Sequence, residues 1–153
     1  MKHAAASIRS AVLFSLIFLF TVTVLLFLAG SDIFGFVAVS AILFGLLGFV
    51  LVLLTLRLKE SHLHRTFFLV TGISAAGIPI SVVLHNLVYA LGILLFGEGF
   101  WAGGTDEPFF FLLAIIVFPI LFMIGAVGCL VLLIPPRMMR VIKSENHQNV
   151  ESS

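Results

Sequence analysis

A short group of polar side chains interrupts an apolar stretch near the middle of the chain: Ser81, His85, Asn86 and Tyr89. On a helix, steps of four place Ser81, His85 and Tyr89 on one face, with Asn86 to one side. An ionisable residue within a membrane helix is by default a functional-site hypothesis, because its charge is unfavourable there. The alternative is a structural role, since polar contacts between membrane helices contribute about 0.6 kcal/mol each. We therefore predict a candidate intramembrane polar site and leave both roles open.

A second group of reactive side chains follows in a glycine-rich loop, which holds Glu98, Asp106 and Glu107. Carboxylates suit hard divalent cations, which bind several oxygens, but the spacing is not that of an EF-hand. The acids are also suited to the start of a helix, with Thr105 or Asp106 as the N-cap and Pro108 in the first turn. We expect a helix start and no resident metal, with an outer-loop cation site as the alternative.

The remaining chemistry-bearing residues are few. Cys129 is the only cysteine, which excludes an internal disulfide, a C-x-x-C metal framework and redox chemistry on paired thiols. His62 and His64 lie in a basic loop, where solvation is a simpler expectation than metal binding. The chain contains no P-loop, dinucleotide fingerprint, G-x-S-x-G or H-E-x-x-H motif, and we expect no cofactor and no nucleic-acid partner.

The composition indicates whether most side chains are surrounded by lipid or by water. Of 153 residues, 61% are hydrophobic, only 10% are charged, and 17 are phenylalanine. Soluble domains carry about 45–50% apolar and about 25% charged residues. A chain of this length cannot bury so much apolar surface in water. We therefore predict an integral membrane protein whose main partner is the lipid bilayer.

Four apolar runs are long enough to cross the bilayer core, which requires about 20 helical residues. They predict an all-α integral membrane protein with four transmembrane helices in an up-down-up-down bundle. The predicted spans are about 8–30, 33–56, 66–96 and 108–134. A short basic interfacial segment then completes a single domain over residues 1–143, and residues 144–153 form a polar, disordered tail.

The charged residues divide between the two predicted sides of the membrane. One side holds all eight bases: Lys2, Arg9, Arg57, Lys59, Arg65, Arg137, Arg140 and Lys143. The other side holds Asp32, Glu98, Asp106 and Glu107. Basic residues in short loops mark the cytoplasmic side, so both termini are predicted to be cytoplasmic, in the plasma membrane. The first 32 residues also resemble a cleavable signal peptide, although their apolar run is longer than the usual 7–15 residues.

Small residues and prolines predict how the helices pack. Ala38, Ala41, Gly45 and Gly48 recur at steps of three, four and three, which follows one seam of a helix pair. We expect this face to meet a neighbouring helix of the same chain or of another copy.

Two prolines predict kinks within helices. Pro79 and Pro119 each lack an N–H group and leave a carbonyl without its helical donor. For Pro119 that carbonyl belongs to Ile115, and our hypothesis is that Tyr89, or His85 and Asn86, donates a hydrogen bond to it.

Three functions fit these features. The expected one is a small multi-pass membrane protein that acts as a structural or accessory component, or that associates with itself, and not as an enzyme. The alternative is an oligomeric transporter or channel subunit whose pathway is lined by the polar residues of the third span. The weakest is a membrane-embedded enzyme or haem binder using His85, because no second histidine and no carboxylate lies within a span.

Overall fold

The structure is a computed structural model that describes residues 2–29, 34–58, 61–101 and 108–134. Its elements are the helices α1 (Lys2–Leu28), α2 (Phe34–Arg57) and α3 (His62–Phe96), the 3-10 helix η1 (Glu98–Trp101), α4 (Pro108–Leu112), the π-helix η2 (Leu113–Val117) and α5 (Phe118–Leu133). α4, η2 and α5 together form one long helical segment. Four helical segments are thus long and apolar enough to cross a membrane, as the four apolar runs predict.

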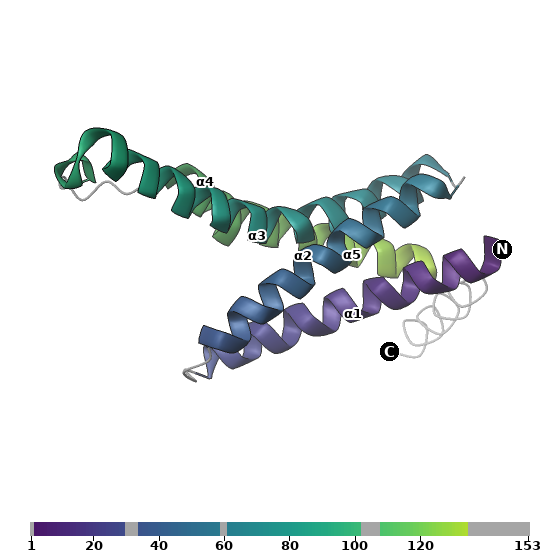
Figure 1. The fold of residues 1–153 in the computed structure, drawn as a ribbon. Helices are drawn as coiled ribbons and strands as arrows, with labels where there is room; N and C mark the ends of the chain where they lie inside the picture. Colours follow the sequence, from purple (N-terminus) through teal and green to yellow (C-terminus); the bar gives the residue numbers. More distant parts are fainter. Residues whose placement is uncertain (1, 30–33, 59–60, 102–107, 135–153) are drawn as a thin grey trace, which may run out of the picture.

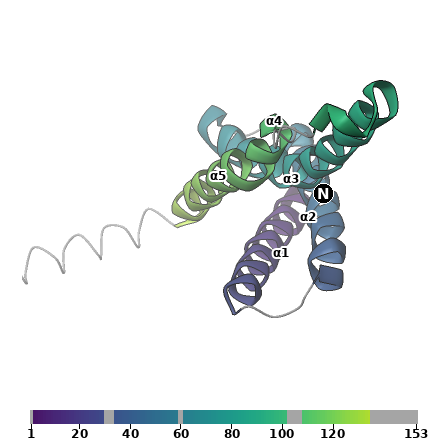
Figure 2. The same cartoon turned by 90° about the vertical axis from the view of Figure 1, so that its left-hand side faces the viewer.

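The long helices are arranged as two hairpins, one made of α1 and α2 and the other of α3 and the α4–η2–α5 segment (Figure 1). The two hairpins pack together near the chain's N-terminus and diverge toward their tips, as both views show (Figures 1 and 2). We call these ends the α1–α2 tip and the α3–α4 tip. The arrangement is therefore more open than a parallel-sided bundle, and much of each hairpin faces outward.

Small residues let α2 and α3 approach closely at their crossing. A Cβ at Gly48 would lie 2.8 Å from both the carbonyl oxygen of Gly72 and the backbone nitrogen of Ala76. A Cβ at Gly45 would lie 2.7 Å from the Cγ atom of Pro79. Two of the four predicted packing residues, Gly45 and Gly48, thus lie directly against α3, which is the mode of packing that small residues permit in apolar helices.

The other two predicted packing residues are placed differently. Ala41 lines an apolar cavity beside the crossing, and Ala38 is exposed. The face of α2 that carries these small residues separates from α3, because α2 leaves α3 as it runs toward the α1–α2 tip (Figure 1). The contact thus covers only part of the predicted face.

The second close contact joins α3 to α5. Positions 125 and 128 are glycines, and a Cβ at either one would collide with Thr71 or Phe67 of α3. Further toward the α3–α4 tip, the ring of Phe118 covers Gly77. α3 therefore lies between α2 and α5 and holds the two hairpins together.

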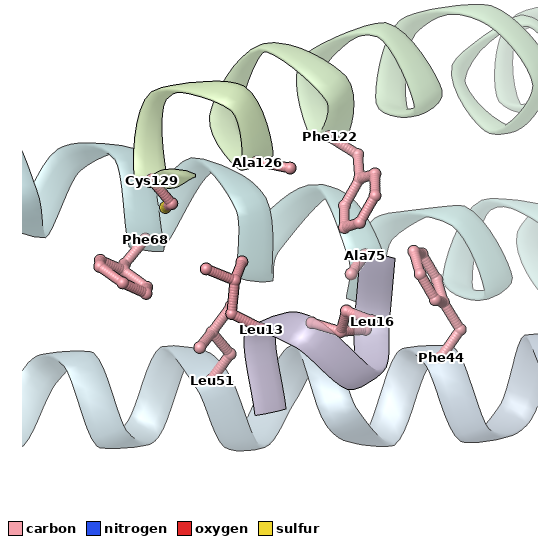
Figure 3. Close-up of a cluster of buried hydrophobic side chains, with 9 residues drawn as sticks. All are labelled: Leu13, Leu16, Phe44, Leu51, Phe68, Ala75, Phe122, Ala126 and Cys129. Atoms are coloured by element: carbon pink, nitrogen blue, oxygen red, sulfur yellow. The ribbon is translucent and has the colours of Figure 1, made fainter. Parts of the chain in front are cut away.

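The core is apolar and draws on all four long segments. Three aromatic rings join α1, α2 and α5, because Phe122 lies 4.9 Å from Phe20 and 5.0 Å from Phe44 between ring centroids. Figure 3 shows the buried side chains Leu13, Leu16, Phe44, Leu51, Phe68, Ala75, Phe122, Ala126 and Cys129.

The two internal prolines are accommodated in different ways. α3 continues through Pro79 as one helix that bends near its middle (Figure 1), and the proline ring fills the space beside Gly45. Before Pro119 the chain forms the π-helix η2, in which the N–H of Phe118 donates to the carbonyl of Leu113. A proline ring would collide with the carbonyl four residues earlier, and a π turn widens the helix at that point.

The helix bounds depart from the predicted spans mainly at polar ends. α1 begins at Lys2 instead of residue 8, and α3 begins at His62 instead of residue 66. Apolar content marks the length that a bilayer core requires, whereas a helix continues through polar residues beyond it. The predicted basic segment after residue 134 and the polar tail lie outside the described residues.

Candidate functional site

The predicted polar residues of α3 occupy two different environments. Ser81 is 3% exposed and lies one turn from Gly77, on the face that Phe118 covers. His85, one turn further on, is half-buried, and its ring centroid lies 5.6 Å from that of Phe111 in α4. This part of the predicted stripe is therefore turned toward the α4–η2–α5 segment of the same hairpin.

Asn86 and Tyr89 have other neighbours. The side-chain amide of Asn86 is exposed and donates to the carbonyl of Val82 in its own helix, at 2.8 Å. The ring of Tyr89 stacks on Trp101, with centroids 5.9 Å apart and planes 18° apart. The amide of Asn86 is thus engaged within its own helix, and the ring of Tyr89 is packed on Trp101.

Tyr89 instead belongs to an aromatic cluster at the α3–α4 tip. Gly97 ends α3 with a φ of 87°, a conformation that glycine adopts readily, and the chain turns back into η1. Trp101 then lies over Gly92 and donates from Nε1 to the carbonyl of Tyr89 at 3.1 Å. The cluster, with Phe100, has the amphipathic character that places aromatic rings at a membrane interface.

The candidate metal ligands do not form a site in the part of the chain that the structure describes. Glu98 lies in η1, whereas Asp106 and Glu107, with the predicted N-cap Thr105, lie outside the described residues. The two loop histidines have separate neighbours: the Ser61 hydroxyl is 2.8 Å from Nδ1 of His64, and the Thr66 hydroxyl is 3.5 Å from Nδ1 of His62. Among the described residues no group of three potential metal ligands is brought together.

A buried polar cluster that the sequence analysis did not find lies between α1, α3 and α5. Arg9 is only 4% exposed, and its guanidinium carbon lies 3.9 Å from the ring centroid of Phe68. Nearby, the Thr71 hydroxyl is 3.7 Å from the sulfur of Cys129. A guanidinium over an aromatic face is favourable, by about 2 kcal/mol where water is excluded.

The burial of Arg9 follows from its position on α1 once the buried face of that helix is known. Leu13 follows Arg9 by four residues and Leu16 follows Leu13 by three, and both leucines are fully buried. Arg9 therefore lies on the buried face of α1. The division of charge between the two sides places Arg9 on the basic side only, because it identifies an end of a helix and not a face.

Several hydroxyl groups of the described residues are satisfied within their own helices. Six of them donate to the carbonyl four residues earlier, as serine and threonine do in apolar helices. They are Ser10, Thr21, Thr23, Thr55, Thr66 and Thr71. These groups are thereby engaged in local bonds instead of being directed together at a ligand.

Two cavities flank the crossing of α2 and α3, and both are apolar. One, of about 170 Å³, lies between the hairpins and is lined by residues of α1, α2, α3 and α5. The other, of about 450 Å³, is a groove between α2 and α3 that includes Gly45, Ala76 and Pro79. Neither of these two cavities is lined by His85 or by the Arg9 cluster.

A comparison of the chain with protein-family models, curated proteins and solved structures finds no match.

Proposed function

We propose that this chain is a small multi-pass protein of the plasma membrane that serves as a structural or accessory component, through contacts of its helices with other membrane helices. The observation that supports this most directly is the distribution of apolar surface. In each of the four described apolar helices, no more than 33% of the most apolar stretch is buried. The remainder requires lipid or another protein as its neighbour.

The arrangement of the polar groups supports the same proposal. Catalytic sites direct several polar groups at one point, in a concave pocket. Here six hydroxyls and the amide of Asn86 bond within their own helices, and the guanidinium of Arg9 covers Phe68 of another helix. These polar groups are thus engaged by the protein itself and not directed together at a substrate.

The orientation follows from the charged ends of the helices. Arg57 and Arg65 are exposed at the end where α2 leads into α3, and Glu98 is exposed at the α3–α4 tip. We propose that the first of these ends is cytoplasmic and the second external, so that both termini are cytoplasmic.

The test is site-specific photocrosslinking in native membranes. A photoreactive amino acid is placed at Leu46 or Val83, which are exposed beside the groove of α2 and α3, and at Phe18 of α1 as the matched position on another outward face. The proposal predicts a discrete protein adduct from the groove positions, of twice the chain's mass for self-association or of another fixed mass for a larger partner.

The opposing result is equally definite. Adducts to lipid alone at every position, in membranes from the native cell, would show a chain without helix partners. That result would overturn the structural or accessory role and favour a functional role for the polar residues His85 and Ser81.

A further inference from the structure

The cavity between the two hairpins has the location and lining of a site for hydrocarbon. Its walls come from the halves of α1 and α2 nearer the α1–α2 tip, and from Ile78 and Pro119 of the other hairpin. Phe20 and Phe44 line it and pack against Phe122, so the aromatic cluster of the core forms one wall. The cavity therefore lies beside this cluster, on the side nearer the α1–α2 tip.

The lining offers almost nothing to a polar ligand. Its two polar members are Thr23, whose hydroxyl donates to the carbonyl of Leu19 at 2.8 Å, and Ser40, which is buried. A water molecule in a cavity needs two to four polar partners, and apolar cavities of about 150 Å³ stay dry and take up apolar molecules instead. With a volume of about 170 Å³, this cavity is suited to an apolar occupant.

The size of the cavity decides between the apolar occupants that a membrane offers. A helix with its side chains is about 10–12 Å across, which is too wide for a cavity of this volume. A single hydrocarbon chain is much thinner and can enter sideways between the diverging hairpins. A second copy of this chain would therefore cover the mouth of the cavity without filling it.

We propose that this cavity binds a segment of one acyl chain of a membrane phospholipid, taken from the leaflet that faces the α1–α2 tip. The inference rests on the proposed membrane location, and under the proposed orientation this leaflet is the outer one. The bound chain occupies the space between Phe20, Ala41 and Pro119, where it keeps the hairpins apart. The lipid is recognised by its tail, and its headgroup stays at the membrane surface.

Quenching of tryptophan fluorescence by brominated lipid tests the proposal. Trp101 is the only tryptophan, so Trp101→Phe removes the native tryptophan fluorescence. A single tryptophan can then be introduced at either of two positions as a reporter. Phe20→Trp reports from the cavity wall, and Phe18→Trp reports from the outward face of α1, where the side chain is 69% exposed. The variants are reconstituted in phosphatidylcholine vesicles with either ordinary or dibrominated acyl chains.

We expect bromine to quench both reporters. Ala41→Phe, which fills the cavity, is expected to abolish quenching of the Phe20→Trp reporter and to leave that of Phe18→Trp unchanged. Ala38→Phe is the matched control, because position 38 is exposed on the same helix, and it is expected to leave both reporters quenched. Val24→Phe is a second variant that fills the cavity. Val24 is partly exposed, so the larger ring at this position does not have to be fully buried.

Two results would overturn the proposal. In the first, the Phe20→Trp reporter escapes quenching while Phe18→Trp is quenched, which means that the chain is inserted but its cavity excludes lipid. In the second, quenching at position 20 survives both filling variants. If instead the Phe18→Trp reporter is also unquenched, the membrane location itself fails, together with the lipid site.

Discussion

The contact between α2 and α3 makes a strong prediction about Gly48. In Gly48→Ala the new methyl group would lie 2.8 Å from the Cβ of Ala75, from the backbone nitrogen of Ala76 and from the carbonyl oxygen of Gly72. Ordinary van der Waals contact begins at 3.4 Å. Two of the three atoms belong to the α3 backbone, so no flexible side chain can move aside and the helices themselves must separate.

The size of the effect follows from two opposing contributions. Overpacking a tight contact costs about 1–3 kcal/mol. Replacing glycine by alanine within a helix contributes about 0.5–1 kcal/mol in the other direction. Taking the middle of each range, the free energy of unfolding of Gly48→Ala is expected to fall by about 1 kcal/mol.

Gly35→Ala is the matched control, because it adds the same methyl group to the same helix where no atom lies within 4 Å. Position 35 is in the first turn of α2, so its gain in helix propensity is small and its stability should equal or slightly exceed that of the wild type. The assay is reversible unfolding in mixed micelles, followed by far-ultraviolet circular dichroism. Equal unfolding free energies for Gly48→Ala and Gly35→Ala would refute the close crossing of α2 and α3.

Two further predictions concern features that lie away from this crossing. Arg9→Lys should lower the free energy of unfolding by about 1–2 kcal/mol, because the compact ammonium group stacks less well on the Phe68 ring than a guanidinium does. Arg57→Lys is the control, because Arg57 is exposed, and it should change the free energy of unfolding little. Gly92→Leu should displace Trp101 from α3, because a Cβ there would lie 2.6 Å from its Nε1 atom, and the change should appear as a shift in tryptophan emission.

Each of these two predictions has a result that contradicts it. Equal losses for the two arginine variants would show that the buried guanidinium contributes no more than an exposed one. An unchanged emission spectrum in Gly92→Leu would show that Trp101 does not lie against α3.

The sequence was sufficient to predict the four long helices, because a run of 20 or more apolar residues is long enough to cross a bilayer core as a helix. It also placed Gly45 and Gly48 on a face suited to close packing. The extent of that contact did not follow, because Ala38 is also a small residue at matching spacing and yet is exposed. Residue type indicates which faces can meet, and the angle between hairpins decides how far they do.

The candidate site was predicted less well for a related reason. Helical spacing groups Ser81, His85 and Tyr89 on one face, but it does not show that the chain turns back at Gly97 and places Trp101 beside Tyr89. The sequence places Arg9 near the start of α1, but its inward direction depends on its position relative to buried Leu13. Such contacts depend on the three-dimensional arrangement and not on the local pattern.

The central claim is that apolar helices cross the plasma membrane with the basic loop between α2 and α3 inside the cell. Cysteine labelling tests it directly, because the only native cysteine, Cys129, is buried. Single variants Ser61→Cys and Gly99→Cys place a thiol at exposed positions on the two proposed sides. With a membrane-impermeant maleimide, the account predicts labelling of Gly99→Cys on intact cells and of Ser61→Cys only after permeabilisation. Labelling of Ser61→Cys on intact cells would contradict it.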